Sequence, residues 1–425
     1  MGKTYEGVIR SVKGSGERSW VQYADWLVFG GIVLLTVTLL RYPEPRSAWR
    51  LVVLTLALVS LAVSFGKGRS ANVPPQIVRL AALYAGIFVA VFAASIAGST
   101  FELAGRQFGN DFLIPSLLPL LLWNHVASER RWQILMYAMA FAAIVLISAN
   151  FLQYMREWQQ FGGIPTEIML HRKHAVNLVF GLSFVIWLGF SANKSWVRWI
   201  AWLLVPLTIA MIIGTGSRGA WLGATFVTAI FGVVTRSRIY GIVLSVGFAI
   251  SLLATLAIVP SEFVVARIQQ GFDTSGRING TWGPALEMAM AHPLLGYGFG
   301  DNVFHHEYNR LVVDRESWLF KTSMGAHSFP LALAFAAGFP ALILFVILML
   351  ALAIAVLRSV RRLDLLANGH ADQWVFSGTA LVAGFVGAYG VMGLFENLSW
   401  TLFGQSLGLV LVWLRFAEAA IAECA

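Results

Sequence analysis

Residues 327–357 read HSFPLALAFAAGFPALILFVILMLALAIAVL, and after His327 this stretch contains no charged side chain. An α-helix needs about 20 apolar residues to cross roughly 30 Å of hydrocarbon, so the stretch predicts a membrane-spanning helix long enough to tilt strongly or protrude. Of the 425 residues, 58% are hydrophobic and 12% are charged. Soluble domains carry about 25% charged residues, so an ordinary soluble protein is excluded. Segments that alternate with period two, typical of outer-membrane barrels, are absent.

Further apolar windows predict an all-α polytopic membrane protein with about twelve transmembrane helices. The window at 112–126 is short and contains Pro115 and Pro119, which predicts a kinked or re-entrant helix. The twelve windows cover residues 24–40, 49–65, 76–97, 112–126, 132–150, 174–190, 196–213, 217–234, 239–260, 327–357, 373–395 and 398–416.

The distribution of Lys and Arg predicts the orientation of these helices. Short loops on the side of the N-terminus hold 17 of these residues, and short loops on the other side hold 8. Positive residues concentrate in short cytoplasmic loops, so both termini are expected to be cytoplasmic. We therefore expect a cytoplasmic tail at 1–23, nine spans within 24–260, an extracytoplasmic loop with short helices at 261–326, three spans within 327–416 and a cytoplasmic tail at 417–425.

Residues 214–219, GTGSRG, separate two apolar runs on the predicted external side. Ser217 suits the N-cap of the helix that follows, and three glycines let a ligand approach the backbone closely. Free N–H groups at a helix start, with the Arg218 guanidinium beside them, suit a phosphate or pyrophosphate. The alternative is that Arg218 reaches toward lipid headgroups at a helix end.

Two further arginines in polar segments are candidate ligands for an anion or a glycan. Arg277 belongs to the sequence DTSGR in the long loop, and Arg172 lies in the polar segment 151–173. A guanidinium can bind a phosphate group with two parallel hydrogen bonds. The alternative for Arg277 is a solvated or ion-paired loop arginine, with Asp273 as its partner.

The middle of the long loop predicts a short helix followed by a bent, glycine-rich segment. Residues 284–291 can form the helix, because Pro284 is suited to its first turn and His-Pro follows its end. The sequence HPLLGYGFG at 292–300 lacks the strand and helix that a nucleotide-binding loop requires. Its glycines instead predict a loop packed on the helical bundle, with Tyr297 and Phe299 as anchors.

His327 stands where apolar sequence resumes after the loop. Histidine is suited to accept a proton near neutral pH, so His327 could deprotonate a sugar hydroxyl that attacks an activated sugar. The alternative is a hydrogen-bonded histidine at a helix start. His305 and His306 are adjacent, but no third and fourth ligand follow at the spacing of a metal site. An Asp-x-Asp pair is also absent, so arginines would have to replace a metal ion.

These features together resemble the O-antigen ligase family. SRGAWL at 217–222 looks like the family's Arg-x-x-x-Leu element, and residues 277–300 resemble a signature shared by ligases and polymerases. His327, the serine after it and Gly338 are similar to the ligase element His-(Asn/Ser/Gln)-x9-Gly. That element normally ends in Gly, Thr or Tyr three residues later, where this chain has Ala341.

The resemblance implies a GT-C-like glycosyltransferase of the Gram-negative inner membrane, with its active site on the periplasmic face. It implies transfer of a polysaccharide from undecaprenyl pyrophosphate to the lipid A–core oligosaccharide, with inversion and without a metal ion or other cofactor. Arg218 and Arg277 would bind the pyrophosphate, and His327 would be the general base. Ser217 and Tyr297, with Arg172, are further candidates for substrate binding; no nucleic acid is expected as a partner.

Three other functions remain open on the residues alone. An O-antigen polymerase and a protein O-oligosaccharyltransferase use the same donor, and they differ from the ligase in the acceptor. A flippase for lipid-linked oligosaccharides would show charges inside its spans and often two similar halves. The candidate charges here gather at one face of the bilayer instead, which argues against transport.

Overall fold

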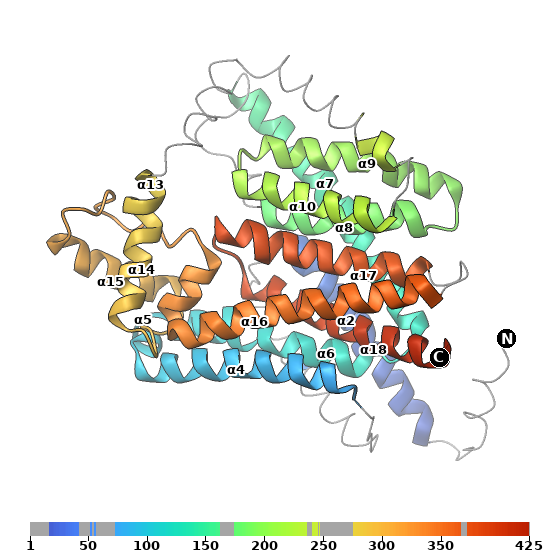
Figure 1. Cartoon of the computed structure of the whole chain (residues 1–425), viewed down its shortest axis with the longest axis horizontal. Coiled ribbons are helices and arrows are strands. Elements are labelled where there is room, and N and C mark those ends of the chain that lie inside the picture. Colours follow the sequence, from blue (N-terminus) through green and yellow to red (C-terminus); the bar gives the residue numbers. More distant parts are fainter. Residues whose placement is uncertain are drawn as a thin grey trace.

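The computed structural model describes most of the chain, and every element in the described ranges is a helix. The long helices lie side by side, and short helices gather at one end of the bundle (Figure 1). The expected all-α architecture is therefore confirmed. The described residues are 17–41, 73–161, 174–235, 275–366 and 372–424, with a few more between 52 and 56 and between 240 and 246.

Seven described helices are long and apolar enough to cross a membrane. Helix α2 (Glu17–Arg41) and helix α8 (Ala175–Ser191) match two more of the expected spans. The windows at 49–65 and 239–260 lie almost entirely outside the described residues, so the number twelve stays a prediction. The seven are α4 (Pro75–Ala97), α7 (Glu129–Phe161), α9 (Ser195–Gly214), α10 (Arg218–Thr235), α16 (Phe329–Leu366), α17 (Asp372–Phe385, continued by the π-helix η6, Val386–Val391) and α18 (Trp400–Cys424).

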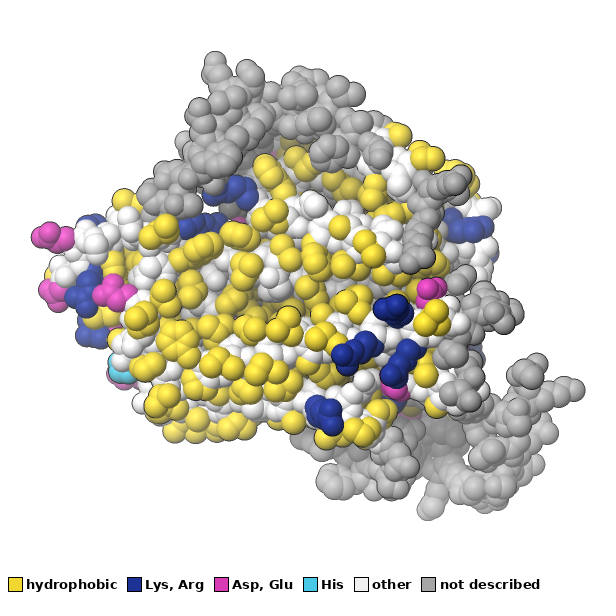
Figure 2. Space-filling view, in the orientation of Figure 1, with side chains coloured by type: hydrophobic (Ala, Val, Ile, Leu, Met, Phe, Trp, Pro, Cys, Tyr) yellow, Lys and Arg dark blue, Asp and Glu magenta, His cyan; other side chains and the backbone are white. Residues whose placement is uncertain are grey.

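Hydrophobic side chains cover the flank of the bundle, and charged side chains gather toward its two ends (Figure 2). Leu203 on α9 and Ile343 on α16 are 71% and 57% exposed. A continuous apolar surface of this size is rare on a soluble monomer, whereas hydrocarbon accommodates it without cost. The exposed surface therefore supports the same conclusion as the lengths of the helices: this is a membrane protein.

The centre of the bundle is formed by α8, whose residues from Ala175 to Gly189 are all buried. It is apolar on every side, as expected for a helix surrounded by other helices, and it packs against α7, α9, α10 and α17. Small residues bring these helices close together. A Cβ atom added to Gly181 would lie 3.3 Å from Cβ of Ala143 on α7.

The expected break near Pro115 and Pro119 is confirmed. Residues 100–125 form a broken helix in place of one straight span, and the break places side chains of its middle section beside a cavity described below. Prolines lack a backbone N–H, and such interruptions are found in membrane helices where neighbouring segments satisfy the freed groups. The pieces are α5 (Thr100–Gln107), the π-helix η1 (Phe108–Leu113), the 3-10 helix η2 (Pro115–Leu117) and α6 (Leu118–His125).

Helix α16 is kinked at Ala337 and Gly338, and the glycine-rich loop packs into this kink. The loop N–H groups of Tyr297 and Gly298 donate to the carbonyls of Phe335 and Ala336, at 2.8 and 2.9 Å. Gly338 has φ +73°, and an added Cβ atom would lie 2.6 Å from the Leu294 carbonyl. The expected packing of the loop on the bundle is confirmed.

The structure also contains the expected short helix in the long loop, as α14 (Gly283–Ala291). Four other short elements accompany it at the same end of the bundle, and Figure 1 shows them beside the start of α16. The other elements are α13 (Ser275–Arg277), the π-helix η4 (Ile278–Trp282), α15 (Asp301–Leu311) and the 3-10 helix η5 (Val312–Asp314). These elements support the residues that form the candidate site.

Candidate functional site

Four segments that are far apart in sequence meet beside the short helices. They are the start of α10, the arc from α13 to η4, the residues just before α16, and the turn between η7 (Met392–Leu394) and α18. Each contributes polar groups, and direct contacts join them in a continuous chain. Three of the four segments carry residues expected from the sequence: Ser217 and Arg218, Arg277, and His327.

The backbone of His327 is held in an unusual conformation. Its φ is +45°, and among the residues that the structure describes it is the only non-glycine residue with positive φ. The His327 carbonyl accepts hydrogen bonds from Nη1 of Arg277, at 3.1 Å, and from Nε1 of Trp282, at 3.2 Å. The next N–H group, of Ser328, donates to Oδ1 of Asn397 at 3.2 Å. Such strain persists only where surrounding contacts enforce it, and it occurs preferentially at functional sites.

Arg277 connects two of the four segments. Its Nη1 also donates to the Phe395 carbonyl at 2.8 Å, so one nitrogen joins the segment before α16 to the turn before α18. The guanidinium carbon lies 5.7 Å from the centre of the Trp282 ring, which in turn packs against the Phe395 ring at 5.8 Å. Arg277 is half-buried and has a defined structural function, which the sequence did not predict. Asp273, the alternative partner, lies outside the described residues.

Glu396 belongs to the same cluster, although the sequence did not predict it. Its Oε1 accepts a hydrogen bond from Oγ of Ser217 at 3.0 Å, and its Oε2 lies 3.8 Å from Nδ1 of His327. The second distance is an ion-pair distance, longer than a hydrogen bond. The available signal was an acidic side chain between the apolar windows 373–395 and 398–416, at the end of the bundle where His327 lies. Ionisable residues at such positions are costly and usually functional.

Ser217 and Arg218 lie at the start of α10, as the sequence predicted. Ser217 is buried, and its Oγ accepts from the N–H of Ala220 at 3.4 Å, a loose version of the expected N-cap contact. Arg218 is exposed. Gly219 brings the helix close to the turn before α18, because an added Cβ atom would lie 3.1 Å from Cβ of Phe395. The first turn of α10 therefore packs directly on the turn that carries Glu396.

The two remaining candidates are not part of this cluster in the structure. Tyr297 stacks on Phe335 of α16 at 4.9 Å and packs against His292 at 4.3 Å, within the packed loop. Burial raises the pKa of the Tyr297 phenol, so this group stays neutral at physiological pH. Arg172 lies outside the described residues.

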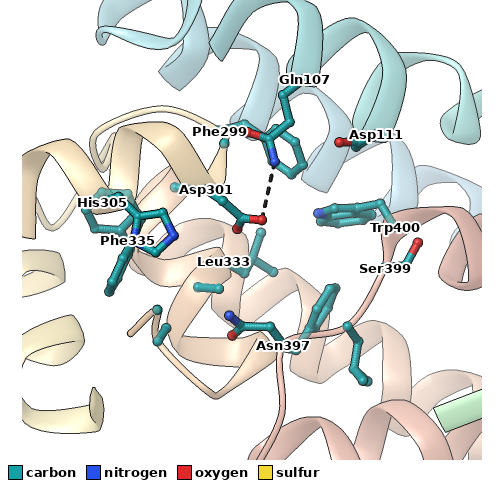
Figure 3. A pocket seen from close by; sticks show the side chains of 18 of the residues that line it. Gln107, Asp111, Phe299, Asp301, His305, Leu333, Phe335, Asn397, Ser399 and Trp400 are labelled. Atoms are coloured by element: carbon teal, nitrogen blue, oxygen red, sulfur yellow. Dashed lines mark hydrogen bonds between the residues drawn. The ribbon is translucent and has the colours of Figure 1, made fainter. Parts of the chain in front are cut away.

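A cavity of about 630 Å³ lies next to the site. It includes Ala326, the residue before His327, and Asn397, the residue after Glu396; Arg218, Arg277 and His327 themselves do not line it. Figure 3 shows side chains from α5, α15, α16 and the turn before α18 around one space. Its polar lining residues are Gln107, Asp111, Asp301, His305, Asn397 and Ser399, and its aromatic ones are Phe299, Phe304, Phe329, Phe335 and Trp400.

The chemistry of this arrangement is that of an imidazole beside a carboxylate, with guanidinium groups nearby. The Nδ1 atom of His327 faces Glu396, which leaves Nε2 to accept a proton from a substrate. Among the described residues, no three His, Cys, Asp or Glu side chains form a group that could hold a metal ion.

Comparison with known proteins finds similarity to O-antigen ligases. The family model for O-antigen ligase matches residues 203–346, which include Ser217, Arg218, Arg277 and His327. Over this segment the chain is similar to O-antigen ligases. A reviewed relative from Salmonella typhimurium strain LT2, named O-antigen ligase, is 27% identical over 319 residues, which cover 72% of this chain and 76% of the relative.

This similarity, together with the helices long enough to cross a membrane, is the basis for the function proposed below. The matched segment runs from α9 through the long loop into α16 and ends before the turn that carries Glu396. The family model covers five of the residues expected from the sequence, namely Ser217, Arg218, Arg277, Tyr297 and His327, whereas Arg172 and Glu396 lie outside it.

Proposed function

We propose that the protein transfers a polysaccharide from undecaprenyl pyrophosphate to the lipid A–core oligosaccharide, on the periplasmic face of the inner membrane. The observation that carries this proposal is the chain of contacts from Ser217 through Glu396 to His327, with the His327 backbone fixed by Arg277. These contacts support the proposal that His327 is a base held in position at the end of the membrane bundle. The relative's name supplies the reaction class.

The proposed reaction is an in-line displacement. Nε2 of His327 takes the proton of the acceptor hydroxyl as its oxygen bonds to the anomeric carbon, and the bond from that carbon to the pyrophosphate oxygen breaks. Undecaprenyl pyrophosphate leaves with the bonding electrons, so the configuration inverts. Glu396 stabilises the imidazolium that forms and keeps the ring oriented, as a carboxylate does in a Ser-His-Asp triad. Its distance of 3.8 Å can shorten once substrate binds.

The two arginines have different proposed roles. Arg218 is exposed at the N-terminus of α10, where helix N–H groups and a guanidinium together favour an anion. It binds the pyrophosphate and stabilises the charge that grows as this group leaves. Arg277 adds positive charge. It also positions His327, because it donates hydrogen bonds to the carbonyls of His327 and Phe395. No bound metal ion is required, because the guanidinium groups supply the positive charge.

Incubation of the purified protein with undecaprenyl-pyrophosphate glycan and lipid A–core tests this function. We expect the glycan–lipid A–core conjugate, at an unchanged yield in excess chelator. Loss of activity in chelator with rescue by a divalent ion would contradict the metal-free reaction. Lengthened lipid-linked glycan in place of the conjugate would identify a polymerase. Modified Ser or Thr residues in an added acceptor protein would identify a protein transferase, and donor movement between leaflets without a new bond would identify a flippase.

Replacement of Glu396 by Gln is expected to lower kcat about tenfold while leaving both KM values nearly unchanged, because the carboxylate acts on His327 and not on substrate binding. Steady-state kinetics with each substrate varied separately measures this effect. Glu316→Gln serves as the control, since Glu316 is an exposed carboxylate outside the site. An unaltered kcat in Glu396→Gln would rule out the supporting role of this carboxylate.

A further inference from the structure

The cavity beside His327 differs in charge from the arginine side of the site. Asp111 and Asp301 line it, and among the described residues in its wall there is no Lys or Arg. Two carboxylates repel a phosphate or pyrophosphate group, so the cavity is unsuited to the charged part of the donor. Carboxylates and amides instead accept and donate hydrogen bonds to sugar hydroxyls.

We propose that this cavity binds a neutral sugar residue of one of the two glycan substrates. The assignment rests on the proposed function, because it places the sugar next to the reacting imidazole. Ala326 and Asn397 line the cavity and are chain neighbours of His327 and Glu396, so a sugar bound here lies beside the reacting groups. The volume of about 630 Å³ lies within the range of small-molecule sites, about 300–1,000 Å³.

The polar wall of the cavity includes a hydrogen-bond acceptor without a partner. Nε2 of Gln107 donates to Oδ2 of Asp301 at 3.3 Å, and this contact fixes the direction of the amide. Oε1 of Gln107 is buried and has no hydrogen-bond partner among the residues that the structure describes. Leaving such an acceptor unpaired is unfavourable, and a sugar hydroxyl would satisfy it after a small rotation of the side chain.

The opposite wall supplies a rigid aromatic surface. Trp400, the first residue of α18, is 7% exposed, and its indole points into the cavity toward the carboxylate of Asp301 (Figure 3). Phe112 and Phe329 hold it, with ring centroids 5.2 and 5.4 Å from the indole. An aromatic plane opposite a few fixed polar groups is the usual composition of a site that orients a small organic ligand. The apolar face of a pyranose ring would lie on the indole while its hydroxyls face Asp301.

Saturation-transfer NMR on the purified full-length protein tests this site without turnover. The probes are two water-soluble glycans: core oligosaccharide released from lipid A, and oligosaccharide released from the lipid-linked donor. Asp301→Asn removes the charge, and Ala332→Leu reduces the space, because Ala332 lines the cavity on α16. Asp314→Asn is the matched control, an exposed carboxylate of the same loop that does not line the cavity.

We expect the signals of one glycan to fall at least fivefold in both cavity variants and to remain unchanged in Asp314→Asn. If the signals of the core oligosaccharide fall in the cavity variants, the cavity binds the acceptor. If the signals of the other glycan fall, the cavity binds the donor. If neither glycan responds, or if Asp314→Asn has the same effect, the assignment is wrong. Because binding is measured without reaction, a responding cavity in a protein that makes no conjugate would contradict the proposed function alone.

Discussion

Replacement of His327 by Ala is expected to lower the rate of glycan attachment by about 10²- to 10⁴-fold, the usual contribution of a general base. The protein should still insert into the membrane and remain folded, since no described side-chain hydrogen bond shorter than 3.5 Å involves this imidazole. Conversion of lipid A–core by the purified variant, followed over hours, measures the residual rate.

The positive φ of His327 calls for a second variant, because alanine also disfavours that backbone conformation. Asn tolerates the left-handed region better than other non-glycine residues, so His327→Asn removes the base and keeps the backbone. We expect the rate to fall by the same large factor in both variants. Activity retained in His327→Asn and lost in His327→Ala would show that this position serves the backbone and not proton transfer.

Replacement of Arg277 by Ala is expected to cost about 10²- to 10³-fold in kcat, the scale for loss of a group that stabilises developing charge. The same change leaves the carbonyls of His327 and Phe395 without the donor that joins them. Kinetic constants for each substrate, together with the thermal unfolding temperature, separate the chemical loss from general destabilisation. Arg310→Ala is a suitable control, because Arg310 is a loop arginine paired with Glu307 and lies away from the site.

Arg277→Lys distinguishes charge from geometry. Lysine keeps the positive charge, but its ammonium is a compact point charge on a flexible stem and lacks the planar guanidinium whose Nη1 donates to both carbonyls. We expect the lysine variant to recover donor KM in part while kcat stays low. Full recovery of kcat in Arg277→Lys would mean that the contacts to the two carbonyls are unimportant for the reaction.

The features that were correctly predicted from the sequence are those set by local composition. The length of apolar runs predicts the spanning helices, prolines predict the break between α5 and α6, and Pro284 predicts the start of α14. The glycine loop was also anticipated, because closely spaced glycines between apolar anchors permit tight packing. The loop packs at the kink of α16 because its backbone N–H groups donate to carbonyls that the kink leaves without a helical partner.

The site was only partly predictable, since its contacts join distant segments. Arginine and histidine at bundle edges indicated Arg218, Arg277 and His327, and the structure brings their segments together. Glu396 was missed because its meaning depends on Ser217, which is 179 residues away in sequence. The structural function of Arg277 could not be predicted either, because its partners are main-chain carbonyl oxygens, which every residue has.

Because Arg277 binds backbone carbonyl oxygens, the site tolerates substitutions and changes in chain length differently. The link from Arg277 ends on the carbonyl of residue 395, which every amino acid provides, so the identity of the side chain there is secondary to its place along the chain. Insertions or deletions between Met392 and Asn397 would disrupt the site, because they would displace both the carbonyl of residue 395 and Glu396. We therefore expect homologues to keep the length of this turn, together with the carboxylate of Glu396.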